Sequence, residues 1–262
     1  MAGKEVMVLD RPNVYGANVV AGPAVDKHNI SCIGLYPIPR VYGMTVGELA
    51  RLLNVEYRLN CKLTIIPLAG YKRGMSWADT GLQWVPPSPN IPTVASAQCF
   101  AATGAIGNAG GLDMGLWNNL PFQTVAMHYL NAAHMAKTMN SLHLPGVIFR
   151  PIHYIPRFGS YKGQKLQGVQ IHVSDGAEFR PATTEVALLW YVERFYGKKG
   201  AKKYTWNKWK NKGYALYVDK AFGRSYVRKA LQRGESYRRI AYSWKSDVDA
   251  FKKQRKKYLI YR

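Results

Sequence analysis

The sequence is poor in acidic residues and in closely spaced metal ligands. Only 15 aspartates and glutamates accompany 37 lysines and arginines in 262 residues, which gives a formal net charge of +22. The three cysteines are far apart without a CxxC pair, and the six histidines form no HExxH motif. This pattern does not indicate a zinc site, and we expect neither a metal nor another cofactor.

Long apolar runs are also absent. No stretch of the sequence is long and apolar enough to span a membrane, and the first residues lack the apolar core of a signal peptide. Hydrophobic residues nevertheless make up 47% of the chain, which is enough for a sizeable folded core in one or two domains.

The positive charge is concentrated in the C-terminal part. Residues 1–160 contain 12 basic and 7 acidic side chains, whereas residues 161–262 contain 25 and 8, a net charge of +17. Such a region attracts nucleic acid, an acidic membrane surface or an acidic wall polymer, or it is simply a solvated cationic face. Tyr204, Trp206 and Trp209 lie among its lysines; they could stack on bases or sugars, or anchor a loop to the core.

Strand and helix signals alternate in the N-terminal part. Residues 5–9 are expected to form a short buried strand, and residues 62–66 are apolar enough for a central strand. Thr45 and Glu48 form a capping box that begins a helix reaching residue 54. This order predicts an α/β fold with a parallel sheet.

The C-terminal part mixes helices and strands in a different order. The pattern predicts helices at residues 121–142 and 184–196, strands at 147–151 and 168–173, and two short final helices that begin at Ser225 and Ser236. We therefore expect a partial Rossmann-like parallel sheet in residues 1–125, followed by a smaller, strongly basic α+β domain in residues 126–262.

Two segments are candidates for a binding cleft. Asp10, Arg11 and Asn13 follow the first predicted strand, and ligands of open parallel sheets bind just beyond such strand ends. Asp10 and Arg11 could instead pair with each other and fix the loop. Residues 84–92 contain four prolines and predict a stiff extended arm carrying Ser88 and Asn90, which could hold a ligand or form a rigid surface connection.

Five segments occur in an order that resembles one known family. They are residues 8–13 (VLDRPN), 34–54 (GLYPIPRVYGMTVGELARLLN), 144–151 (LPGVIFRP), 168–173 (GVQIHV), and the ending that contains Trp244, Phe251 and Tyr258. This order resembles the exo-β-N-acetylmuramidase (NamZ-type) family, formerly a domain of unknown function. The resemblance implies a periplasmic or secreted glycosidase that removes terminal N-acetylmuramic acid from peptidoglycan-derived sugars.

The resemblance also leads us to expect an incomplete domain. Members of the family carry a substantial segment before the VLDRPN motif, so the chain is expected to match the C-terminal two-thirds and to lack the N-terminal half-domain. The glutamate favoured as catalytic in the family lies in that segment, so the catalytic residue is unknown and the chain is expected to be truncated or inactive. An upstream segment or a partner subunit would then complete the N-terminal domain.

The residues that the resemblance assigns to the wall of a sugar cleft form one set: Asp10, Arg11, Asn13, Tyr36, Arg40, Ser88 and Asn90. Muramic acid carries a lactyl carboxylate, and arginine suits a planar carboxylate, so either Arg11 or Arg40 could bind it.

A glycosidase commonly uses two carboxyl groups that flank the scissile bond. Glu48 is interpreted as a helix cap, and Glu185 and Glu193 are interpreted as surface positions. The carboxyl groups that remain near plausible cleft loops are Asp10, Asp79 and Asp113.

A second function remains open on the sequence alone. The chain could be a non-catalytic binding or scaffold protein that holds an anionic polymer, either a cell-wall glycan or nucleic acid, through its basic aromatic C-terminal region. The family resemblance continues on both sides of that region, which disfavours nucleic acid as the partner.

Overall fold

The computed structural model describes residues 3–197, 204, 206 and 216–262, so Trp209 and most of the basic aromatic loop lie outside the described residues. The elements are β1 (Glu5–Leu9), β2 (Ala21–Ala24), β3 (Pro39–Val41), α1 (Val46–Glu56), β4 (Lys62–Ile66), α2 (Val94–Thr103), β5 (Thr124–Met127), α3 (Ala132–Ser141), β6 (Val147–Tyr154), β7 (Leu166–Val173), α4 (Pro181–Tyr196), α5 (Tyr217–Phe222), α6 (Ser225–Gln232), α7 (Tyr237–Ser243) and α8 (Lys245–Arg255). None of the described helices is long and apolar enough to cross a bilayer.

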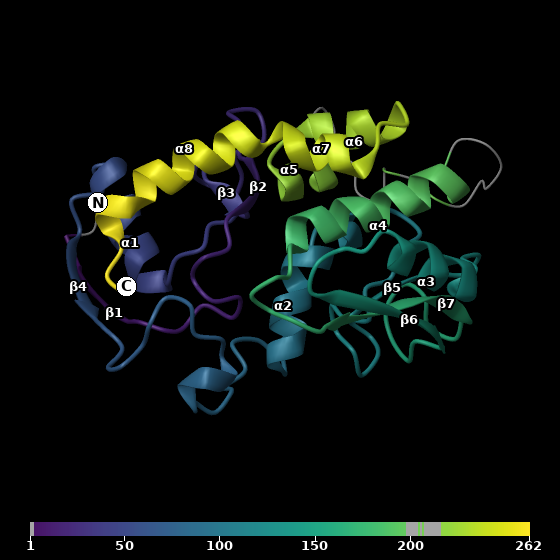
Figure 1. Cartoon of the computed structure of the whole chain (residues 1–262), viewed down its shortest axis with the longest axis horizontal. Helices are drawn as coiled ribbons and strands as arrows, with labels where there is room; N and C mark the ends of the chain where they lie inside the picture. The colour runs from purple at the N-terminus through teal and green to yellow at the C-terminus, as the bar shows by residue number, and fades with distance from the viewer. Residues whose placement is uncertain (1–2, 198–203, 205, 207–215) are drawn as a thin grey trace.

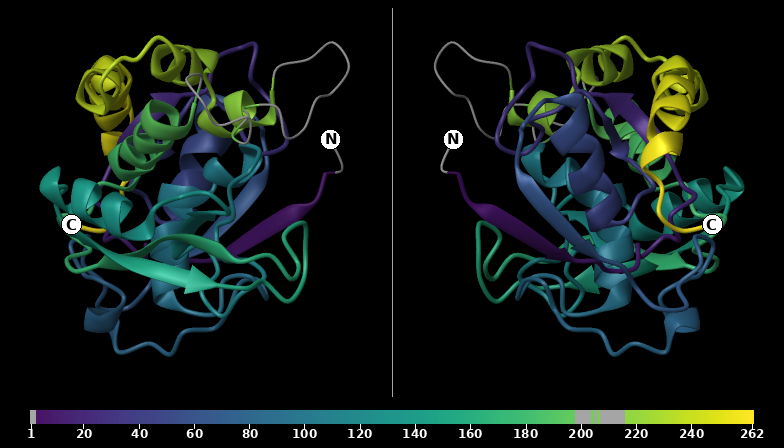
Figure 2. Two further views of the ribbon diagram at one scale, coloured as in Figure 1. Left: turned by 90° about the vertical axis from the view of Figure 1, so that its right-hand side faces the viewer. Right: turned by 90° about the vertical axis from the view of Figure 1, so that its left-hand side faces the viewer.

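A parallel strand pair forms one end of the molecule (Figure 1). β1 and β4 pair from Glu5 opposite Lys62 to Leu9 opposite Ile66, and α1 crosses between them. The mixed α/β fold with a parallel sheet is confirmed. The two strands were predicted to be buried, but they are largely exposed. In the described part of the chain this sheet has only two strands, and α1 is the helix that packs against them. Met7 is 61% and Leu9 68% exposed, and Figure 2 shows β1 reaching outward from the body.

The other end contains an antiparallel sheet with the strand order β5-β7-β6. α3 packs against β6 and β7, and α4 packs in turn against α2 and α3 (Figure 1). The predicted helix at residues 121–142 is wrong in its first half, because β5 pairs with β7 there and is buried along its length. The helix begins only after Asn131, whose side chain accepts a hydrogen bond from the backbone N–H of His134.

One continuous apolar core joins the two ends. α4 runs through its centre and packs against α2, α3, α6 and α7. α8 then returns along the top of the molecule, so the C-terminus lies beside α1 (Figure 1). The last residues are therefore in position to contact the strand pair that begins the chain.

A buried ion pair crosses this core. Arg40, at the centre of β3, pairs with Glu185 of α4, whose carboxylate also accepts a hydrogen bond from the backbone N–H of Ala105 at 2.8 Å. Glu185 was predicted on the surface, but its side chain is fully buried because α4 has apolar residues around most of its circumference. Burial raises the pKa of the Glu185 carboxyl, while the Arg40 charge lowers it.

Replacing Arg40 with methionine should reduce the free energy of unfolding by about 3–5 kcal/mol, because Glu185 then stays buried without its counter-charge. Urea unfolding at pH 7 measures the loss. Burial without Arg40 keeps the pKa of the Glu185 carboxyl raised, so the loss should shrink as the pH falls from 7 toward about 4.3, where the carboxyl of the unfolded chain also takes up its proton. Glu5→Gln, which breaks an exposed pair with Lys62, should change stability by less than about 1 kcal/mol. A similar loss in both variants would contradict the assignment.

Candidate functional site

The carboxyl end of β1 carries a buried aspartate whose two oxygens are both occupied. Oδ1 of Asp10 accepts hydrogen bonds from the backbone N–H of Arg11 at 2.9 Å and of Gly47 at 2.8 Å. Oδ2 accepts from the hydroxyls of Thr45 at 2.6 Å and Tyr261 at 2.7 Å. Asp10 therefore fixes the start of α1 and the end of the chain, and it has little capacity left for a ligand.

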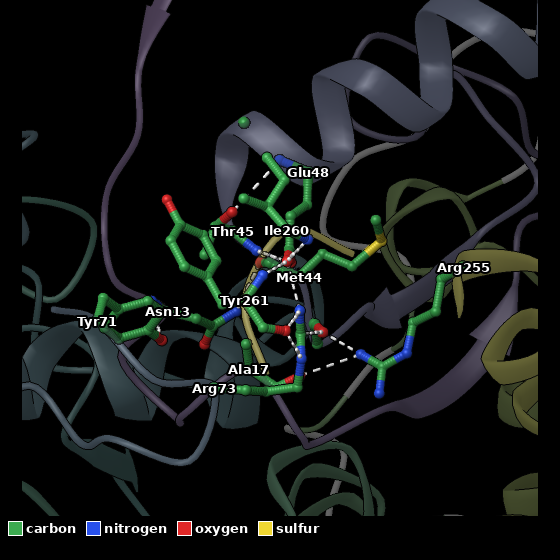
Figure 3. Close-up of polar contacts among 12 residues, drawn as sticks. Asn13, Ala17, Met44, Thr45, Glu48, Tyr71, Arg73, Arg255, Ile260 and Tyr261 are labelled. Carbon is green, nitrogen blue, oxygen red and sulfur yellow. Dashed lines mark hydrogen bonds and ion pairs between the residues drawn. The ribbon is translucent and has the colours of Figure 1, made fainter. Parts of the chain in front are cut away.

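Beside Asp10 lies a second buried carboxylate, Glu48. The predicted capping box is confirmed, since Glu48 Oε2 accepts from the Thr45 N–H at 3.1 Å and Thr45 Oγ1 accepts from the Glu48 N–H at 3.3 Å. Its other oxygen accepts from the N–H of Ile260 at 2.7 Å and pairs with Arg73. Figure 3 shows Glu48 next to Ile260 and Tyr261, with Arg73 approaching from the other side.

Two arginines complete this buried cluster. Arg73 donates to the carbonyl oxygens of Tyr261, at 3.1 and 3.2 Å, and of Ala17, at 3.1 Å. Arg255, from the last turn of α8, donates to the same Ala17 oxygen at 3.1 Å and also to Gly43 (Figure 3). Burial and the neighbouring Arg73 charge lower the pKa of Arg255 to about 10. These contacts hold α8 and the strand pair together.

Asn13 uses its side-chain amide in hydrogen bonds within the protein, whereas the guanidinium of Arg11 is available. Asn13 donates from its side chain to the Met44 carbonyl at 3.0 Å and accepts from the Tyr15 N–H at 3.0 Å, so it shapes the loop after β1. Arg11 is exposed, and within the described part of the chain its guanidinium makes no hydrogen bond or ion pair. The local pair between Asp10 and Arg11 involves only the Arg11 backbone. Arg11 is thus the charged group that this edge offers to a ligand.

Tyr36 and Arg40 do not join this edge. Tyr36 packs against Tyr57 with tilted rings, 4.3 Å between centroids, at the C-terminal end of α1, whereas Asp10 lies at its N-terminal end. Because α1 is 11 residues long, the two positions are separated by about 16 Å of helix. Arg40 is not available to a ligand, because it forms a buried ion pair with Glu185.

Ser88 and Asn90 lie in the proline-rich segment 84–92. The Asn90 N–H donates to Ser88 Oγ at 3.3 Å, and Asn90 is exposed. The arm is braced by Trp84, whose indole donates to the Ile91 carbonyl at 3.2 Å and packs edge-on against Trp77, 4.8 Å between centroids. The segment is not extended throughout, because it turns where the Ile91 N–H donates to the Ser88 carbonyl at 2.9 Å. Asn90 faces solvent and Ser88 is half-buried, and the stiffness of the segment stays a prediction.

Asp79 was another acid predicted near a plausible cleft loop, and the C-terminal aromatics were predicted either to stack on a polymer or to anchor a loop. Asp79 is exposed and bonded to Ser76, whose side chain and backbone lower its pKa. Trp206 is buried and donates its indole N–H to Glu193 at 2.8 Å, and Tyr204 packs 5.3 Å from it. The side chains of Trp206 and Tyr204 pack in or against the core, which removes them as stacking surfaces for a polymer.

Sequence reasoning missed most of the buried cluster. Only Glu48 had a local signal, the capping box. This signal predicted its hydrogen bonds at the start of α1 but not its contacts with Arg73 and Ile260. Arg73 and Tyr261 are 188 positions apart in the sequence, and Arg255 and Gly43 are 212 apart. No local pattern connects such partners.

The fold and this edge define a class: an α/β protein whose parallel strand pair ends in a buried polar cluster beside one exposed arginine, followed by an antiparallel three-stranded sheet. The chain belongs to the exo-β-N-acetylmuramidase NamZ family. The family's N-terminal model matches residues 1–95 and its C-terminal model matches residues 98–261. The prediction that the chain lacks the N-terminal domain is therefore wrong.

Individual relatives agree with this assignment. The chain is 36% identical over 259 residues to the peptidoglycan β-N-acetylmuramidase NamZ of Bacillus subtilis (strain 168), covering 99% of this chain and 60% of the relative. Two crystal structures of DUF1343 family proteins from Bacteroides fragilis NCTC 9343 are also similar. They have TM-scores of 0.88 and 0.72 and identities of 34% and 25%, and each match covers 99% of this chain and 67% of the other.

The hydroxyl of Tyr261 tests the role of the cluster. Tyr261→Phe should lower the free energy of unfolding by about 1–3 kcal/mol, because Asp10 loses a donor and the Leu68 N–H loses its acceptor at 2.9 Å. Chemical denaturation measures this effect. Tyr242→Phe is the matched control, since Tyr242 is 73% exposed and its hydroxyl should contribute little. Equal stability of both variants would show that the Asp10 contact is not stabilising.

Proposed function

We propose that the protein is a peptidoglycan glycosidase of the exo-β-N-acetylmuramidase type, which hydrolyses terminal N-acetylmuramic acid from muropeptide or glycan fragments. The observation that carries the proposal is the match of both family domain models, together with the identity to a peptidoglycan β-N-acetylmuramidase along nearly the whole chain. With peptidoglycan as its substrate, the protein would work in the periplasm or outside the cell.

Arg11 is the group that we assign to substrate recognition. It follows β1 directly, at the strand edge where open α/β sheets bind ligands, and its guanidinium is exposed. The lactyl carboxylate of muramic acid is planar and anionic, and arginine can donate two parallel hydrogen bonds to it. Arg40, the other candidate, would first have to leave Glu185 uncompensated in the core.

The proposed activity is measured with a chromogenic β-N-acetylmuramide. Incubation with the purified protein should release the chromophore, whereas the matched β-N-acetylglucosaminide, which lacks the lactyl carboxylate, should be hydrolysed much more slowly. Boiled protein gives the blank. Release no faster than this blank would overturn the proposed function.

Arg11→Ala should weaken binding of N-acetylmuramic acid by about tenfold or more, because a charge-assisted pair contributes about 1.5–3 kcal/mol. Titration calorimetry measures the affinity. Arg11→Lys should recover only part of it, since lysine keeps the charge but loses the paired geometry.

The control for Arg11 is Arg51→Ala, which removes another exposed arginine, from α1. Arg51→Ala should leave the affinity for N-acetylmuramic acid unchanged. Neither Arg11→Ala nor Arg51→Ala should change the affinity for the uncharged N-acetylglucosamine. Equal weakening by Arg51→Ala would mean that general positive charge, and not Arg11, attracts the sugar acid.

A further inference from the structure

The last two α-helices of the chain have one buried and one exposed side. α7 and α8 are separated only by Trp244, and both lie along the top of the molecule (Figure 1). Their buried side chains recur every three or four residues and are Tyr237, Ile240, Trp244, Val248, Phe251 and Arg255. Residues at this spacing share one side of a helix, so the other side of α7 and α8 faces solvent.

The exposed side of these helices is strongly basic. Its charged side chains are seven cations and one carboxylate: Arg238, Arg239, Lys245, Lys252, Lys253, Lys256 and Lys257, and Asp249. We call these residues, together with Tyr242, the α7–α8 strip. A helix C-terminus favours cations, which accounts for those in the last turn of α8, but Arg238, Arg239 and Lys245 lie outside that turn.

Three lysines of the α7–α8 strip have no counter-charge. The ion pairs that the strip makes are Arg239–Glu235, Lys245–Asp249 and Lys257–Glu56. Among the residues that the structure describes, Lys252, Lys253 and Lys256 have neither an ion pair nor a side-chain hydrogen bond. Lys252 and Lys256 are four residues apart, and like charges at this spacing on a helix repel each other. A layer of negative charge above the strip would remove this repulsion.

The shape of the α7–α8 strip favours a flat partner. The buried side of α8 packs on β2 and β3, so its exposed side forms a ridge. At 3.6 residues per turn, the four lysines of α8 and the residue after it point outward within an arc of about 100°; they are Lys245, Lys252, Lys253 and Lys256. All four can meet a flat surface at once, whereas a single polymer strand lies along only one row of them.

The side-chain types favour lipid headgroups over nucleic-acid bases. Lysine is a flexible point charge that needs no fixed geometry in its partner, unlike the planar fork of arginine. Tyr242 is 73% exposed and precedes Lys245 by three residues. Its ring is of the amphipathic kind that is enriched where a bilayer meets water. α8 itself exposes no large apolar side chain, so contact would stay at the level of the headgroups.

We propose that the α7–α8 strip binds an anionic phospholipid surface. α8 lies parallel to this surface, its lysines meet the headgroup phosphates, and the Tyr242 ring rests among the headgroups. A lysine close to an anionic bilayer increases binding about fivefold, so the three unpaired lysines together contribute about a hundredfold. Added salt weakens this attraction. The inference does not depend on the proposed function, because its ligand is a phospholipid and its test uses no glycan.

Sedimentation with vesicles of equimolar phosphatidylcholine and phosphatidylglycerol tests the strip, with vesicles of phosphatidylcholine alone as the blank. The native protein should bind the mixed vesicles and dissociate when salt is added. Changing Lys252, Lys253 and Lys256 together to glutamine should weaken binding by about a hundredfold. Changing the same three lysines to arginine keeps the charge and should preserve binding. Tyr242→Ser should weaken vesicle binding several-fold, because the ring contact with the headgroups is lost.

The matched control changes Lys137, Lys162 and Lys165 together to glutamine. It removes the same total charge from exposed lysines of α3 and of the hairpin that joins β6 to β7. α8 packs instead on β2 and β3, so the control leaves the strip intact. Its binding to the mixed vesicles should stay close to that of the native protein. Melting temperatures check that every variant is folded.

The proposal is overturned if the native protein binds both kinds of vesicle equally, or if the folded glutamine variant of the strip binds like the native protein. Equal weakening by the control variant also overturns it, because net charge and not the strip would then attract the lipid.

A linear polyanion is the remaining alternative, and soluble polyphosphate and single-stranded DNA represent it. At equal phosphate concentration both should bind more weakly than the mixed vesicles, and Tyr242→Ser should not affect them. Tighter binding of either one, lost in the glutamine variant of the strip, would make the strip a site for linear polymers and overturn the membrane proposal.

Discussion

The pairing of Glu48 with Arg73 is the interaction on which the rest of the structure depends. Glu48 lies in the first turn of α1, yet its carboxylate also holds the backbone of Ile260, near the end of the chain. Arg73 also donates a hydrogen bond to the Tyr261 carbonyl, so both members of the ion pair contact the last residues of the chain. Removing either charge would leave the other buried, and the last residues of the chain would lose part of their attachment to α1.

This stabilising cluster limits which residues remain for function. Asp10 and Asn13 stand at the strand edge where a ligand is expected, but the fold uses their hydrogen-bonding groups. Arg40 is likewise used in the core, where it compensates Glu185. Arg11 remains the candidate for recognition at this edge, because its guanidinium makes no contact with the residues that the structure describes.

Charge makes Arg11 the group proposed to bind a sugar acid. It is an exposed cation, and its guanidinium can donate two parallel hydrogen bonds to a planar carboxylate. The proline-rich segment around Ser88 and Asn90 is held by the hydrogen bond from the Trp84 indole to the Ile91 carbonyl.

The sequence by itself determined the features that depend on near neighbours: the capping box that starts α1, and strands β1, β4, β6 and β7. It also indicated the family through five ordered segments. Tertiary structure alone decided that β5 is a strand, because its pairing with β7 outweighs a local helical pattern. It alone decided that Arg40 binds Glu185, since partners 145 positions apart leave no periodic signal and meet only when the core closes.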